Sequence, residues 1–242
     1  MTSPTLTARV LVQALPYIQR FTGKSVVVKL GGAAIDAELD RALAQDVLLL
    51  RSVGVRCVLV HGGGPQVDSV MRKMGKQPEF RDGLRVTDAE TLEIVRMVLV
   101  GGVNRDLVAT INRETRDDPV AVGVAGEDGG LLTAVPRDPS LGFVGDVAEV
   151  RAGRLHGLLE DAKDEESLIP RLSSAELRER IAHESVSAGM IPKLRACADA
   201  VDGGVGSAHI IDGRVPHALL IEILTDEGIG TMVKRDLAEP GQ

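Results

Sequence analysis

Two stretches decide the fold: Val26-Val27-Val28-Lys29-Leu30-Gly31-Gly32 and Val58-Leu59-Val60-His61-Gly62-Gly63-Gly64. Each is a β-branched apolar run that breaks into consecutive glycines, and a helical pattern follows each one. Runs of Val and Leu bounded by Gly are typical of buried parallel strands. Glycine after a strand lets backbone N–H groups approach an anion without a Cβ in the way. Because α/β proteins hold phosphate at the carboxyl ends of parallel strands, the pair indicates phosphoryl chemistry.

The composition favours helices packed on a parallel sheet. The chain has 242 residues, 44% of them hydrophobic and only 2% aromatic, with no Trp and one Tyr. Few rings are available to stack on bases, and the formal net charge of −7 opposes a polyanionic partner. A nucleic-acid partner is therefore not expected. In such an acidic protein, each Lys or Arg beside a glycine loop gains significance.

The cysteine and histidine pattern predicts neither a disulfide nor a metal site. Cys57 and Cys197 are interpreted as small buried hydrophobes. The five histidines are scattered and form no zinc spacing, so no metal-ligating residue is predicted. No apolar run approaches the ~20 residues of a membrane span, and no signal-peptide pattern is visible at the N-terminus. We expect a cytoplasmic protein without a membrane partner.

Strand and helix patterns alternate along the chain, and no linker divides it. Helices are expected at residues 5–20, 38–53, 65–74, 88–112, 173–182, 193–201 and 216–224. Strands are expected at 25–30, 56–61, 120–124, 131–135, 143–150 and 208–211, with a hairpin or loop at 80–87 and a short strand after 231. The first helix, which Pro16 is expected to kink, has a pattern that fits packing on its own domain and on another subunit equally well.

Three common catalytic motifs are absent. Gly23-Lys24-Ser25 looks like the end of a P-loop, but Ile18 stands where that motif needs glycine, and the segment precedes a strand. No G-x-G-x-x-G follows a strand, which weakens a dinucleotide-binding interpretation. G-x-S-x-G is missing as well, so the sequence does not support a serine hydrolase.

Cations and glycines nevertheless stand where phosphoryl transfer needs them, because that reaction depends on positioning and on cations that neutralise the transferred group. Lys29 lies just before Gly31-Gly32, so its ammonium can reach a phosphate held over those glycines. The glycines at 62–64 open a helix at Pro65, and a helix N-terminus attracts anions. Arg85 offers a planar fork suited to a carboxylate. Taken singly, each of these features also fits an ordinary strand end, turn or surface arginine.

Together these residues resemble the amino acid kinase family and, within it, the arginine-sensitive branch of the acetylglutamate kinases. The matching stretches span nearly the whole chain: VVVKLGGAAI, VLVHGGGPQVD, DGLRVTDAETL, SAGMIPKLRACADAV and SAHIIDGRVPHALLIEILTDEGIGT. The resemblance implies an α/β fold, a three-layer αβα sandwich with a central, mostly parallel sheet. It implies one domain, with an N-terminal helix at 1–22, an acetylglutamate-binding N-lobe at 23–160 and the remainder of the nucleotide-binding lobe at 161–242.

The resemblance also implies a reaction, in which the γ-phosphate of ATP passes to the γ-carboxylate of N-acetyl-L-glutamate and Mg²⁺ bridges the ATP phosphates. Lys29 and Lys193 would stabilise the transition state from opposite sides of the transferred group. Gly63 and Gly64 would bind substrate through backbone N–H groups, and Arg85 would clamp its α-carboxylate. Gly31 and Gly32 would cradle the ATP phosphates. The DGLRVT and HIIDGR stretches argue against a carbamate or aspartate kinase of the same family.

The two ends of the chain resemble the regulatory part of the arginine-sensitive branch. In that branch N-terminal helices interlace dimers into a hexamer, and arginine binds between this helix and the C-terminal part. By resemblance, the arginine site would include Tyr17, His209, Glu222 and Gly228. Feedback inhibition by arginine in a homo-oligomer, a dimer or a hexamer, is therefore a hypothesis.

The chain departs from the family after Glu160, where a block normally follows but the sequence runs directly into Asp161-Ala162-Lys163-Asp164. In the family that block supplies a substrate Asn, the Asp that orients both lysines, much of the adenine pocket and two core strands, whose loss exposes sheet edges. Three explanations are open. The block belongs to the native molecule but not to this sequence, or a shortened relative has remodelled its site, or the deletion is real. A real deletion predicts a catalytically impaired arginine- or nucleotide-binding homologue.

Overall fold

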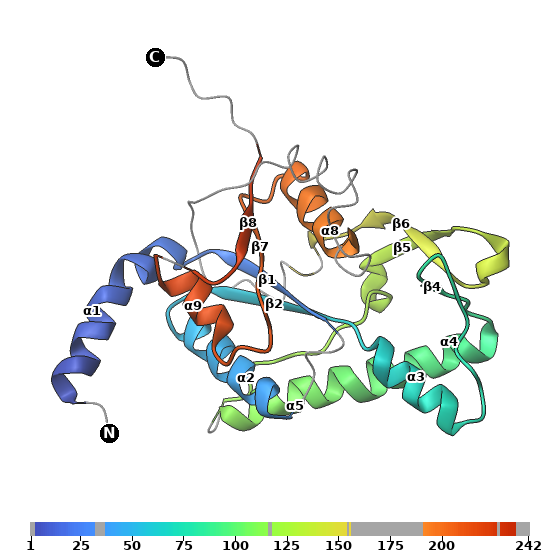
Figure 1. Cartoon of the computed structure of the whole chain (residues 1–242), viewed down its shortest axis with the longest axis horizontal. Coiled ribbons are helices and arrows are strands. Elements are labelled where there is room, and N and C mark those ends of the chain that lie inside the picture. The colour runs from blue at the N-terminus through green and yellow to red at the C-terminus, as the bar shows by residue number, and fades with distance from the viewer. Residues whose placement is uncertain are drawn as a thin grey trace, which may run out of the picture. The chain divides into compact units, whose positions relative to one another are not determined.

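The computed structural model describes residues 3–31, 37–115, 118–153, 155, 191–226 and 228–235. The chain divides into two compact units. One unit consists of residues 25–163, and the other consists of residues 1–24 together with 164–242. Figure 1 shows the helices and strands of both, coloured along the chain.

A parallel strand pair organises the unit at 25–163. β1 (Ser25–Leu30) and β2 (Arg56–His61) pair in parallel, from Ser25 opposite Arg56 to Leu30 opposite His61. Parallel strands need a crossover connection, and α2 (Ala37–Ser52) provides it. The sequence predictions of both strands, of the helix between them and of an α/β fold are confirmed.

A long helical segment packs against these elements. α4 (Ala89–Arg96), a π-helix called η2 (Met97–Asn104) and α5 (Arg105–Glu114) follow one another without a break. The helix predicted at 88–112 is thereby confirmed. One buried cluster joins it to α2, and a second joins it to α3 (Gly64–Lys73). Their buried members are Ala44, Leu107 and Ile111 in the first cluster and Val67, Met71, Ile94, Val98 and Val103 in the second.

The π-helical turns in this segment were not predicted from the sequence. A π-helix bonds i to i+5 and is wider than an α-helix, so residues five apart lie closer to one face. Val98 and Val103 are five apart, and both are buried in the cluster shared with α3. Gly101 and Gly102 lie between them, and an added Cβ at either would meet no other atom within 4 Å.

Three of the described strand pairs are antiparallel, and two of them belong to this unit. β3 (Phe80–Arg81) and β4 (Leu84–Arg85) form a short hairpin, and Asp82 and Gly83 between them have φ of 49° and 77°. Two positive φ angles are what a type I′ turn requires, so the predicted Asp82-Gly83 turn is confirmed. β5 (Leu132–Pro136) pairs with β6 (Gly145–Val150), as the expected strands at 131–135 and 143–150 indicated. Among the described strands only β1 and β2 are parallel.

The strand predicted at 120–124 is wrong, because no strand is formed there. The side chain of Asn112 on α5 bonds this backbone instead. Its Oδ1 accepts hydrogen bonds from the N–H groups of Val120 (2.9 Å) and Ala121 (2.8 Å), and its Nδ2 donates to the carbonyl of Ala121 (3.1 Å). An amide side chain thus satisfies backbone groups that a neighbouring strand would otherwise bond.

The other unit combines both ends of the chain. α1 (Pro4–Phe21) begins at Ser3, whose side chain accepts a hydrogen bond from the N–H of Leu6. α8 (Ile191–Asp202) and α9 (Ala218–Leu224) accompany the antiparallel pair β7 (Ala208–Ile210) and β8 (Thr231–Val233). Its buried cluster consists of Leu194, Ala198, Val201 and Val233. These elements were predicted, whereas the helix expected at 173–182 lies outside the described residues.

Neither Cys57 nor Cys197 forms a disulfide among the described residues, and both are half-buried. Burial raises the pKa of the Cys57 thiol to about 11, so it stays protonated at neutral pH. Among the described residues, no helix is long and apolar enough to cross a membrane. The cytoplasmic location stays a prediction.

Replacing Asn112 by Ala is expected to destabilise the unit at 25–163. The N–H groups of Val120 and Ala121 lose their acceptor, which lowers the free energy of unfolding by about 2 kcal/mol. Urea denaturation of the variant, compared with an Arg113→Ala control on the exposed face of α5, measures the loss. Equal stabilities of the two variants would contradict the assigned role of Asn112.

Candidate active site and regulatory site

The two glycine loops leave the sheet at the same edge. Leu30 lies opposite His61 at the carboxyl ends of β1 and β2, and the N–H of Gly62 donates to the carbonyl of Leu30 at 3.3 Å. Gly31 and Gly62 therefore continue adjacent strands side by side. Gly32 lies outside the described residues.

The backbone at this edge is open on the side where a side chain would stand. An added Cβ at Gly31, Gly62 or Gly64 would meet no other atom within 4 Å. At Gly63, by contrast, it would lie 2.5 Å from Cδ2 of Leu99 and 3.3 Å from Cγ2 of Val103. Gly31 and Gly64 thus leave room for a ligand near the main chain, whereas Gly63 also permits close packing on the π-helix.

The two predicted catalytic lysines belong to different units. Lys29 is exposed near the carboxyl end of β1, two residues before Gly31. Lys193 is exposed in the first turn of α8, in the unit that holds the chain ends. Only Lys29 is thereby placed beside a described glycine loop, and the convergence of both lysines on one phosphate stays a prediction.

Arg85 reaches from β4 to the first turns of α3. Its Nη1 forms an ion pair with Asp68, and its Nη2 donates to the carbonyl of Gly64 at 3.4 Å. The guanidinium carbon lies 4.7 Å from the centroid of the Phe80 ring, a cation–π distance. The side chain is only 12% exposed. Arg85 therefore stands beside the glycine loop at 62–64, already oriented by a carboxylate.

Asp68 was not singled out in the sequence, although a signal for it exists. Gly64 and Asp68 are four residues apart on α3, and residues at that spacing lie on the same helical face. A carboxylate one turn beyond a glycine-opened helix therefore lies within reach of a cation at that loop.

His61 is a second residue that was not assigned a role. Its Nε2 lies 3.2 Å from Nδ2 of Asn104, and its Nδ1 lies 3.0 Å from the carbonyl oxygen of Gly62. An amide nitrogen only donates, so Nε2 accepts and Nδ1 carries the hydrogen that is donated to Gly62. His61 thereby fixes the first peptide of the loop to the end of the π-helix.

The predicted arginine-site residues lie together in the other unit. Glu222 on α9 is 2.6 Å from Nδ1 of His209 on β7 and accepts hydrogen bonds from the N–H groups of Ile229 (2.7 Å) and Gly230 (2.8 Å). At Gly228, where φ is +55°, an added Cβ would stand 2.9 Å from Glu222 Oε2. Tyr17 on α1 is hydrogen-bonded to Asp226, which raises the pKa of the tyrosine.

Glu222 is held in its ionised form. Burial disfavours the charge, but the hydrogen bonds from His209 and from the N–H groups of Ile229 and Gly230 outweigh it, so the pKa of Glu222 lies below its usual range. The carboxylate thus joins β7, α9 and the loop before β8.

Mg²⁺ is the metal that the resemblance implies. Among the described residues, no group of three or more His, Cys, Asp or Glu side chains is placed to hold a metal ion. These residues therefore do not form a Mg²⁺ site by themselves, and no reaction step is assigned to the metal.

Comparison with known proteins identifies the class of this protein. The model of the amino acid kinase family matches residues 24–163, more than half of the chain. The chain belongs to the amino acid kinase family.

Acetylglutamate kinases are among the curated proteins that this chain is similar to. That of Nostoc punctiforme is 42% identical over 277 residues, covering 93% of this chain and 92% of the relative. That of Acaryochloris marina is 44% identical over 277 residues, covering 93% and 96%. Because 93% of 242 residues is about 225, about 50 of the 277 aligned positions have no residue in this chain. These figures are consistent with the predicted missing block, and its position after Glu160 stays a prediction.

Solved structures support the expected fold. An N-acetylglutamate synthase from Neisseria gonorrhoeae, complexed with coenzyme A and N-acetyl-glutamate, has a TM-score of 0.78 at 21% identity. The match covers 96% of this chain and 64% of that chain. The same synthase complexed with coenzyme A and L-arginine has a TM-score of 0.77 at 23% identity, and the match covers 95% of this chain and 65% of that chain. The expected α/β sandwich class is confirmed.

Glu222→Gln should make the stability of the folded protein depend less on pH between pH 6 and pH 3. A carboxylate with a lowered folded-state pKa contributes stability above its unfolded pKa, about 4.3, and loses it as the pH falls through the folded value. The wild type should therefore lose more stability than the variant as the pH falls from 6 to 3, in thermal unfolding. Glu93→Gln, at an exposed position on α4, is the control. Parallel profiles for the wild type and Glu222→Gln would contradict the assignment.

Proposed function

We propose that this protein transfers the γ-phosphate of ATP to the γ-carboxylate of N-acetyl-L-glutamate, giving an acyl phosphate in arginine biosynthesis. The observation that carries the proposal is the pair of glycine loops at one edge of β1 and β2. The 42–44% identity to acetylglutamate kinases supports the choice of acceptor.

The acceptor binds at the start of α3. The N–H groups of the first helical turn have no partner within the helix, and an anion there also gains from the helix dipole. Gly63 and Gly64 bring the substrate to these groups. Arg85, which already contacts the carbonyl of Gly64, holds the α-carboxylate, while its pairing with Asp68 orients the guanidinium.

The donor binds at Gly31 and Gly32, with Lys29 beside them. An oxygen of the γ-carboxylate attacks the γ-phosphorus as the bond from phosphorus to the bridging oxygen of ADP breaks. Charge on the transferred group is neutralised by Lys29 on one side and Lys193 on the other. The nucleophile needs no general base, because a carboxyl group with a pKa of about 4 is already ionised at neutral pH.

Magnesium would supply charge neutralisation to the ATP phosphates. The cytoplasm is the compartment we propose for this reaction.

The arginine-site residues are proposed to bind L-arginine as a feedback inhibitor. Tyr17 on α1 is hydrogen-bonded to Asp226, two residues before Gly228. A ligand bound beside Glu222 and His209 would therefore lie close to the contact that holds α1. α1 leaves several large apolar side chains exposed, Leu11 at 61% and Val12 at 69%. We propose that this helix contacts another copy of the chain in a homo-oligomer.

The activity is tested by trapping the acyl phosphate with hydroxylamine. We first confirm by intact mass that the protein is 25.6 kDa, and then assay it with ATP and N-acetylglutamate. Lys29→Ala and Lys193→Ala should each lower the rate by about 10²–10³-fold, because each removes a cation from the transition state. Lys73→Ala, at an exposed position on α3, should keep full activity. No hydroxamate from folded protein of this mass would overturn the kinase proposal and favour the impaired homologue.

Arginine should lower turnover and change the oligomer in the full-length protein. His209→Ala should weaken this response, because the ring pairs with Glu222. Turnover and light scattering are measured with and without arginine, and Arg214→Ala, at an exposed position after β7, is the control. Unchanged turnover and unchanged oligomer in the wild type would contradict the regulatory proposal.

A further inference from the structure

The hairpin that carries Arg85 is too short to hold itself in place. Its paired residues are Phe80 with Arg85 and Arg81 with Leu84, and one further bond runs from the N–H of Val86 to the carbonyl of Glu79 at 2.9 Å. An isolated two-stranded hairpin is marginally stable in water. The position of Arg85 therefore depends on how the base of the hairpin is fixed.

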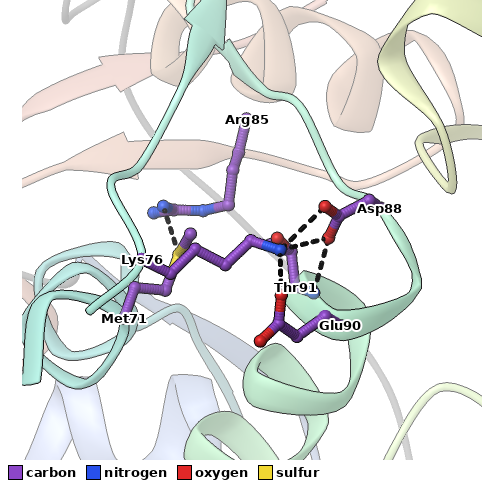
Figure 2. A network of polar contacts seen from close by, with 6 residues as sticks. All are labelled: Met71, Lys76, Arg85, Asp88, Glu90 and Thr91. Carbon is purple, nitrogen blue, oxygen red and sulfur yellow. Dashed lines mark hydrogen bonds and ion pairs between the residues drawn. The ribbon is translucent and has the colours of Figure 1, made fainter. Parts of the chain in front are cut away.

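Two sets of contacts fix that base: the backbone of Thr87 bonds to Leu141 (2.9 Å) and Phe143 (2.7 Å) on one side, and Lys76 ties it to α3 on the other. Figure 2 shows its ammonium between the carboxylates of Asp88 and Glu90. Nζ donates to both oxygens of Asp88, at 2.8 and 2.7 Å, and to Oε2 of Glu90 at 2.6 Å. The lysine side chain is 21% exposed, whereas the two carboxylate side chains are 61% and 66% exposed.

Both ends of this contact are tied to helices. The backbone N–H of Lys76 donates to the carbonyl of Met71 at the end of α3, at 2.9 Å. Asp88 is the N-cap of α4 and accepts from the N–H of Thr91 at 2.8 Å. The contact therefore joins the end of α3 to the start of α4 and closes the loop of residues 77–87.

Arg85 uses the same part of α3. Besides Asp68 and the carbonyl of Gly64, its guanidinium contacts Sδ of Met71 at 3.4 Å. Met71 thus takes part in the contacts of both Lys76 and Arg85, and Figure 2 shows all three side by side. Opening the loop at Lys76 would let the hairpin move relative to the glycine loop.

The contact stays ionised at neutral pH. The hydrogen bonds from Lys76 and Thr91 hold the pKa of Asp88 well below its usual range, and those to Asp88 and Glu90 raise the pKa of Lys76. Neither group titrates near neutral pH.

We propose that Lys76 is a positioning residue, which fixes the place where the β3–β4 hairpin presents Arg85 to the acceptor loop at Gly64. The inference rests on the proposed function, in which Arg85 binds the α-carboxylate of the acceptor. Lys76 itself touches no substrate and acts through Asp88 and the hairpin.

Steady-state kinetics of Lys76→Met test the proposal. The variant keeps the length and apolar stem of the side chain but loses the charge, so Arg85 should be misplaced. We expect the KM for N-acetylglutamate to rise about tenfold, with the KM for ATP unchanged. Lys76→Arg should keep the KM for N-acetylglutamate close to the wild-type value, and Lys73→Met, at the exposed last residue of α3, should behave as wild type.

A double variant separates positioning from general stability. If Lys76 acts through Arg85, adding Lys76→Met to Arg85→Ala should raise the KM for N-acetylglutamate no further. A full tenfold increase in the Arg85→Ala background, or an equal rise in both KM values, would overturn the proposal.

Hydrogen exchange tests the loop contact without an activity measurement. In Lys76→Met, amide exchange across residues 77–87 should become faster, including the N–H of Val86, while α5 stays protected. Unchanged exchange overturns the role of Lys76. Faster exchange in a protein that forms no acyl phosphate supports the loop contact but overturns the kinase, so the two failures are distinguishable.

Discussion

The parallel register of β1 and β2 is the constraint on which the rest of the site depends. Because Leu30 lies opposite His61, Gly31 and Gly62 leave the sheet together, and the N–H of Gly62 closes the pair on Leu30. α3 then starts at Gly64, and Arg85 finds its partners on the first turns of α3. If the pairing register of β1 against β2 shifted by one residue, one glycine loop would move along the edge of the sheet. Lys29 would then point to the opposite face of the sheet.

Carboxylates of the chain itself hold its functional cations and rings in place. Asp68 orients Arg85, Asp88 fixes Lys76, and Glu222 holds His209. Such pairs reduce the reorganisation needed when a ligand binds, because the side chain already occupies a defined position. A protein with a formal charge of −7 can thus place a few cations locally, as the proposed anionic ligands would require.

Local patterns predicted most of the helices and strands that the structure describes. Val-rich runs located β1 and β2, and the Asp82-Gly83 dipeptide located the hairpin turn, because turn geometry and strand burial act over a few residues. The segment at 120–124 reads as a strand for the same reason, yet the distant Asn112 bonds its backbone instead. The π-helix likewise depends on Val98 and Val103 packing against α3, which periodicity does not show.

The candidate site was only partly predictable. The glycine loops, Lys29 and Arg85 are visible as local motifs, whereas His209 and Glu222 were assigned by family resemblance. Asp68 and Lys76 act through partners that the sequence does not reveal, since Lys76 pairs with residues 12 and 14 positions away. Side-chain pairs across a turn emerge only from the folded chain.

Calorimetric titration of two glycine variants tests most directly the claim that one sheet edge holds donor and acceptor on separate loops. An added Cβ at Gly31 or Gly64 meets no other atom within 4 Å. Gly31→Val should weaken binding of a non-hydrolysable ATP analogue and leave N-acetylglutamate binding unchanged, and Gly64→Val should do the reverse. Identical effects of the two variants on both ligands, or no effect of either, would contradict the account.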